Sequence, residues 1–157
     1  MDNVPSPELT AQWHRRFAAS CNNRAWALSW QETRSDQDNR EMLDVAHAAS
    51  YHWDKVGTAL NHARADVTLA HVHALLGHGE LALAYARACL AFFEAGNGED
   101  WDLAFAHMEM ALAAVVLGDR DLYDRHYALA TQLGQAVADI EDREVFLEEL
   151  ARVPVLH

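Results

Sequence analysis

Apolar residues recur along this chain at the three-to-four-residue spacing of an α-helix. The segment 38–56 is an example, and one of its faces is formed by Met42, Val45, Ala49, Trp53 and Val56. We find no strict alternation of apolar and polar residues of the kind that marks a half-buried strand. Residues that end helices follow at a steady interval, at Gly57, Gly77, Gly98, Gly118 and Asp139. The pattern predicts an all-α protein whose helices of about 20 residues are joined by short turns.

We expect one domain over residues 1–157, with about seven or eight helices. The motif Ser6-Pro7-Glu8 supplies an N-cap, a first-turn proline and a first-turn acid, so it predicts the start of an N-terminal helix over 7–20. Asn22 or Asn23 is expected to cap the next helix. The remaining helices are expected to form hairpins at 22–56, 58–96 and 99–138, followed by a C-terminal helix at 140–152.

Two of these hairpins share a period of 41 residues. Leu76-Gly77 and Leu117-Gly118 fall at the turns inside the pairs, and the small residues Cys89 and Ala130 fall at equivalent places in the second helices. A small residue where helices cross and a glycine at a tight turn are what stacked helical hairpins require. The sequence therefore predicts a stack of such hairpins.

The set Leu76-Gly77, Cys89 and Phe93 resembles the Leu-Gly…Ala…Phe framework of tetratricopeptide repeats, although the period is longer and no proline closes the unit. The resemblance implies a right-handed stack of antiparallel helical hairpins, a TPR-like α-solenoid that binds a protein or peptide in a concave groove. Separately, the segment SYHWDKVG at 50–57 is similar to one in small uncharacterised bacterial proteins.

In a stack of this kind the first helix of each pair lines the groove. One face of 58–76 and the face 41 residues later supply the candidate groove residues, which are Asn61, Arg64, Thr68, His71, Asp102, Phe105 and Glu109. One interpretation is that Arg64 pairs with Asp102 or Glu109 and only satisfies a half-buried surface. The other is that the cation, the acids and the aromatic ring bind a peptide or small molecule with a basic group. The sequence leaves both open.

The ten histidines raise the question of a metal. His62 and Asp66 are one helical turn apart, a spacing at which two side chains can share an ion. His73 lies on the same face but nearly two turns further, so ligands from another helix would be needed. We therefore prefer a structural role for His62, Asp66 and His73, and keep them as metal candidates.

Other polar and aromatic clusters have structural interpretations. The acidic run 139–149 fits a capped helix with a solvated face, and it lacks the pattern of a calcium loop. Trp26 and Trp30 are one turn apart, and we prefer a place in the core to a ligand platform, with an oligomer contact if the pair is exposed.

Net charge and composition limit the classes of partner that we expect. With 24 acidic and 12 basic residues the net charge is -12, which disfavours nucleic acid and acidic membranes as partners. The N-terminus has no apolar core of a signal peptide, and Cys21 and Cys89 are isolated thiols, so we expect a cytoplasmic protein.

No nucleophile motif or glycine-rich phosphate loop is present in the sequence. We therefore expect a non-enzymatic protein- or peptide-binding interaction module without a cofactor. The alternative is a small-molecule- or metal-binding helical protein, an enzyme among the options, that uses the same groove. A homodimer or a self-associating structural subunit also remains open.

Overall fold

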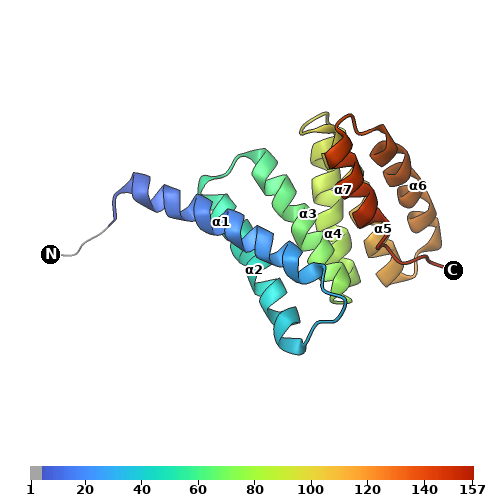
Figure 1. Ribbon diagram of the computed structural model, residues 1–157, viewed down its shortest axis with the longest axis horizontal. Coiled ribbons are helices and arrows are strands. Elements are labelled where there is room, and N and C mark those ends of the chain that lie inside the picture. Colours follow the sequence, from blue (N-terminus) through green and yellow to red (C-terminus); the bar gives the residue numbers. More distant parts are fainter. Residues whose placement is uncertain (1–4) are drawn as a thin grey trace.

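The computed structural model describes residues 5–157, and within that range the fold is all-α, with no strand (Figure 1). The predicted fold class is confirmed. The described helices are α1 (Pro7–Ser29), α2 (Asp36–Val56), α3 (Ala59–Leu75), α4 (Gly79–Glu94), α5 (Asp100–Leu117), α6 (Arg120–Ala136) and α7 (Ile140–Leu150).

Local capping explains most helix starts. Ser6 accepts a hydrogen bond from the backbone N–H of Leu9 and Pro7 occupies the first turn of α1, as the sequence predicted. Thr58 and Asn61 form a reciprocal capping box at the start of α3, and Asp139 caps α7. Each such cap stabilises its helix by about 1 kcal/mol, because it satisfies backbone N–H groups that have no partner within the helix.

The predicted helix break near residue 21 is wrong. α1 continues through Asn22 and Asn23 to Ser29, so the first hairpin is formed by α1 and α2. The segment 19–24 contains no glycine or proline to end a helix. The side chain of Asn22 does not cap a helix but contacts Thr68 on α3. The chain therefore stays helical where we expected a turn, and Asn22 makes a tertiary contact there in place of the expected cap.

The helices pack as a succession of hairpins. α1 packs on α2, α3 on α4 and α5 on α6, and each hairpin also packs on the next (Figure 1). The odd-numbered helices contact one another in order, from α1 to α3, α5 and α7. Among residues 5–157, α2, α4 and α6 pack closely only against odd-numbered helices. The odd-numbered helices thus share one continuous layer.

Small residues let the helices approach closely. The main core cluster is rich in alanine, with Ala70 on α3, Ala86 on α4 and Ala111 on α5 fully buried. Gly134 on α6 lies directly against the ring of Phe146 on α7, and a Cβ at that position would overlap the ring. The ring of Phe146 therefore takes the space that a side chain at position 134 would need. None of the helices described in residues 5–157 has the length and apolar character needed to cross a bilayer.

Candidate functional site

A cavity of about 300 Å³ opens between the odd-numbered helices. Its aromatic walls are Trp26, Trp30, Trp101 and Phe105. Its remaining lining residues are Asn22, Arg64, Val67, Thr68, Asp102, Asp142, Val145 and Glu149. We call this cavity the interhelical pocket. It draws residues from α1, α3, α5 and α7, and from Trp30 immediately after α1, so it exists only when these elements are packed together.

Arg64 and Asp102 form a bidentate ion pair on one wall. The Nε and Nη2 atoms of Arg64 donate to the two carboxylate oxygens of Asp102 at 2.9 and 2.8 Å. Asp102 is buried, and it also accepts the backbone N–H of Glu99 at the start of α5. The guanidinium lies 4.5 Å from the ring centroid of Trp101, and its hydrogen bonds to Asp102 raise the pKa of Arg64. Arg64 is therefore a fixed and neutralised part of the wall.

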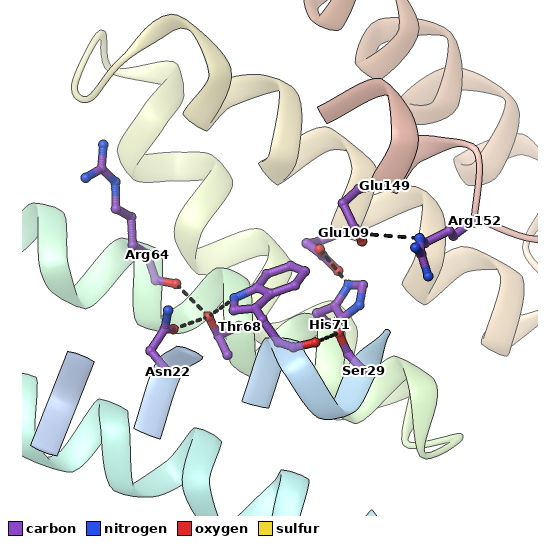
Figure 2. A network of polar contacts seen from close by, with 9 residues as sticks. Asn22, Ser29, Arg64, Thr68, His71, Glu109, Glu149 and Arg152 are labelled. Atoms are coloured by element: carbon purple, nitrogen blue, oxygen red, sulfur yellow. Dashed lines mark hydrogen bonds and ion pairs between the residues drawn. The ribbon is translucent and has the colours of Figure 1, made fainter. Parts of the chain in front are cut away.

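Trp26 is held by a hydrogen-bonded relay. Its indole N–H donates to the hydroxyl of Thr68 at 3.1 Å, and that hydroxyl donates to the amide oxygen of Asn22 at 2.7 Å. Figure 2 shows Thr68 joined to Asn22 across the α1–α3 interface. The Trp26 ring also packs against His71, with centroids 4.5 Å apart, and against the edge of Phe105. The relay leaves this indole little freedom to rotate.

Below the aromatic walls, His71 and Glu109 form a buried pair. The imidazole Nδ1 and the Glu109 Oε1 are 3.0 Å apart, and Glu109 is fully inaccessible to solvent. Burial lowers the pKa of His71. The charge of Glu109 and the hydrogen bond to it together raise this pKa by more than burial lowers it, so the net shift is upward. Burial raises the pKa of Glu109, and the nearby charge of Glu149 adds to that effect. The pair therefore retains the proton that lies between its members.

Glu149 on α7 lies beside this pair, as Figure 2 shows. It is only 6% exposed, and its nearest cation, Arg152, lies 3.6 Å from one carboxylate oxygen, which is long for a hydrogen bond. The other oxygen, Oε2, has no hydrogen-bond partner, and the same is true of Oε2 of Glu109. Two buried acceptor atoms at the pocket floor are thus unpaired.

Most of the predicted groove residues come together. Arg64, Thr68, Asp102 and Phe105 line the pocket, while His71 and Glu109 lie beneath it. Of the two partners that the sequence left open for Arg64, the structure pairs it with Asp102 and not with Glu109. Asn61 does not line the pocket, because it is in the first turn of α3 and its side chain completes the capping box with Thr58.

Sequence reasoning missed several pocket residues. Glu149 was assigned with the run 139–149 to a solvated face, and this assignment was wrong because Glu149 is buried. Its spacing from Phe146 and Val153 could have revealed it, since an acid at three or four residues from apolar positions shares their face. Trp101 and Asn22 gave no such signal. For Trp26 and Trp30 the core was preferred to a ligand platform, whereas both line the pocket and Trp30 is 48% exposed.

The metal candidates do not converge. His62 contacts the backbone oxygen of Trp53 at 3.1 Å, and His73 pairs with His78, with 3.0 Å between their Nδ1 atoms. Burial raises the pKa of Asp66 to about 6. Within residues 5–157, no group of three or more His, Cys, Asp or Glu side chains is placed to hold a metal ion.

Histidine pairs join the helices elsewhere. His107 on α5 and His126 on α6 lie with their Nδ1 atoms 2.8 Å apart, and His14 on α1 and His52 on α2 are joined in the same way at 2.7 Å. Each pair requires at least one neutral ring as the acceptor. Burial lowers the pKa of His126 to about 4 and also lowers the pKa of His107 and His52.

No protein family matches the chain, and neither a search of curated proteins nor one of solved structures found a match. What the fold and the site establish is a class: an all-α stack of helical hairpins with an aromatic, acidic pocket in its odd-numbered layer.

Proposed function

We propose that this protein is a non-enzymatic interaction module that binds a segment of a protein or peptide partner in the interhelical pocket, in the manner of a tetratricopeptide-like α-solenoid. The observation that carries the proposal is the pocket itself, which is built by successive first helices of the hairpins and walled by Trp26, Trp30, Trp101 and Phe105. Tryptophan is among the residues that contribute most to binding energy at protein interfaces.

The state of the polar side chains supports binding over catalysis. Arg64 and Asp102 are engaged with each other, so they position Trp101 and do not supply a free acid or base. Cys89 is buried and burial raises its pKa, which makes its thiol a poor nucleophile. Both cysteines are free, which supports our placing the module in the cytoplasm.

A small-molecule ligand in the same pocket is the second candidate. The cavity volume of about 300 Å³ equals the lower limit of typical ligand pockets, so one side chain or a small metabolite would fill it. The acidic character of the chain, with a net charge of -12, favours a basic ligand over a nucleic acid in either case.

Site-directed photo-crosslinking tests the proposal. A benzophenone amino acid replaces Val145, an exposed residue of the pocket rim, and in a control protein it replaces Leu81, which is similarly exposed on α4 outside the pocket. We expect a partner that crosslinks from position 145, does not crosslink from position 81, and is lost in the Trp101→Ala background. Equal crosslinking from both positions, or no effect of Trp101→Ala, would contradict the proposal.

Native mass spectrometry of the same tag-free proteins tests the second candidate. A small molecule that is retained by the wild type and lost in Trp101→Ala would favour a metabolite over a peptide. The same spectrum reports whether the chain forms the homodimer, which stays a prediction. An apolar stripe at the start of α1 is exposed and available for such a contact, and it consists of Leu9, Trp13 and Phe17.

A further inference from the structure

The floor of the interhelical pocket contains buried acceptors that the chain leaves unpaired. Oε2 of Glu109 and Oε2 of Glu149 are both inaccessible and have no hydrogen-bond partner. Such atoms are rare in folded proteins, where nearly all buried polar groups are paired. Of the three buried unpaired side-chain atoms found in the described part of the chain, two lie at this one place. The arrangement points to a partner that the chain itself does not supply.

The neighbouring cations are engaged or too far away. Arg64 is held by both oxygens of Asp102, and Figure 2 shows its guanidinium directed away from the two glutamates. Arg152 is 55% exposed and lies 3.6 Å from the other oxygen of Glu149. The hydrogen bond between His71 and Glu109 joins Nδ1 to Oε1, so it leaves Oε2 without a partner. Within the described part of the chain, neither Oε2 atom thus has a donor at hydrogen-bond distance, and of the two glutamates only Glu149 lines the pocket.

The walls above these oxygens suit an organic cation. Trp26, Trp101 and Phe105 present aromatic rings to the pocket, and a cation close to such a face is attracted by the ring. Asp142 adds a carboxylate at the exposed rim. Asp102 and Glu149 are the buried carboxylates of the lining, and Arg64 already occupies both oxygens of Asp102. A quaternary ammonium would satisfy the rings but has no N–H to donate, so it would leave the glutamate oxygens unpaired.

We propose that the interhelical pocket binds an organic cation with N–H donors, an alkylammonium or a guanidinium, whose charged end donates to the carboxylate of Glu149. This inference rests on the proposed function, because it takes the same pocket as the binding site. The cation has two sources that share this chemistry: the basic side chain of a peptide partner or a free alkylamine.

The first experiment uses the wild-type protein and four small probes. The indole N–H resonances of the pocket tryptophans are followed by NMR during titration with n-butylammonium, n-butylguanidinium, butyltrimethylammonium and 1-pentanol. We expect the two N–H cations to bind at least about tenfold more tightly than the quaternary cation or the alcohol, because only they form charge-assisted hydrogen bonds. Equal affinity for 1-pentanol or the quaternary cation overturns the inference, as does the absence of binding by every cation.

The second experiment removes the acceptor. Glu149→Gln preserves the size of the side chain and removes its charge, and Glu148→Gln makes the same charge change one residue earlier, at an exposed position of α7. Glu149→Gln is expected to weaken the binding of n-butylammonium about tenfold or more, while Glu148→Gln leaves the affinity for this probe unchanged. Unchanged affinity in Glu149→Gln overturns the inference. Should this variant fail to fold, which circular dichroism would show, the wild-type probe series still decides.

A third experiment, with peptides, distinguishes the two sources of the cation. An acetylated and amidated alanine–serine peptide with one central lysine is compared with the same peptide carrying norleucine and with n-butylammonium. Tighter binding of the lysine peptide supports the inference with a peptide as the source, and tighter binding of the free amine supports it with a small molecule.

If 1-pentanol and the norleucine peptide shift the same indole signals as well as the cations do, the pocket binds ligands but the cation assignment is wrong. If crosslinking from position 145 fails while the N–H cations bind, the proposed partner function is wrong and the cation site stands.

Discussion

His71 and Glu109 meet across the α3–α5 interface, with the imidazole Nδ1 3.0 Å from the carboxylate. They are 38 residues apart, and the same separation joins Arg64 to Asp102 on the same two helices. Facing residues of these two helices therefore follow an offset of 38, whereas equivalent residues of successive repeats follow the period of 41. The two ion pairs hold one face of α3 against α5, and the interhelical pocket opens above them.

Truncation of Glu109 should destabilise the fold strongly. Glu109→Ala leaves the imidazole of His71 buried without its acceptor and opens a void, so we expect a loss of about 3 kcal/mol in the free energy of unfolding. Glu109→Gln keeps an acceptor for His71 and should cost less. Urea unfolding measures both, with Glu148→Ala as an exposed control that changes stability by less than about 0.5 kcal/mol. A loss below about 1 kcal/mol for Glu109→Ala would show that the buried pair contributes little.

The bidentate pair between Arg64 and Asp102 should couple energetically. In a double-mutant cycle with Arg64→Ala and Asp102→Ala, we expect a coupling of about 1 to 3 kcal/mol, because Asp102 is buried while Arg64 is partly exposed and screened by solvent. Arg64→Lys keeps the charge but loses the planar pair of N–H donors that matches a carboxylate. We therefore expect its stability to be closer to that of Arg64→Ala than to that of the wild type. Wild-type stability of Arg64→Lys would argue against the importance of the geometry. Urea unfolding again provides the measurement.

His126 should contribute stability that is lost in acid. Its pKa is lowered to about 4 by burial, whereas an unfolded histidine titrates near pH 6.5. The unfolded chain therefore binds more protons between these values, and this share of stability is complete above about pH 6.5 and falls as the pH falls toward 4. We expect the stability advantage of the wild type over His126→Gln to shrink across this window. An advantage that is the same at pH 7 and pH 4.5 would contradict the lowered pKa.

Asp66 should respond to pH in the opposite direction. Burial raises its pKa to about 6, so the folded protein binds more protons than the unfolded chain between about pH 4 and 6. Its ionisation therefore costs stability as the pH rises through this window. Asp66→Asn removes the titration, and its stability relative to the wild type should increase between pH 4 and pH 7. Unfolding curves at both values measure this change, and a constant difference would show that Asp66 is well solvated.

Gly134→Ala should show how closely α6 and α7 pack. Because the new Cβ would overlap the ring of Phe146, we expect a loss of about 2 kcal/mol from overpacking. The double variant Gly134→Ala with Phe146→Leu should recover part of this loss, since leucine leaves room for the methyl group. If the double variant is less stable than the sum of its single changes implies, the contact is not the cause.

The helices could be predicted from the sequence because their signals are local. Helical periodicity, the cap at Ser6-Pro7, the turns at Gly77 and Gly118, and the cap at Asp139 each act within a few residues, and the structure has a helix boundary at each. The 41-residue period also placed Arg64 and Asp102 on the groove faces of successive first helices, although their pairing follows the offset of 38. The break near Asn22 was predicted wrongly because an asparagine that could cap a helix is used for a contact with Thr68 on another helix.

The pocket depends on which side chains of distant helices meet. Trp26 and Glu149 lie far apart in the chain, and only the packing of α1 on α3 and of α7 on α5 brings both to one cavity. Glu149 belongs to an acidic run whose other members suit a solvated helix, so its charge alone did not reveal its burial. Local hydrogen bonding and apolar spacing determined the all-α stack from sequence alone. The tertiary structure decided which polar groups are buried without a partner, because burial depends on every helix that covers a residue.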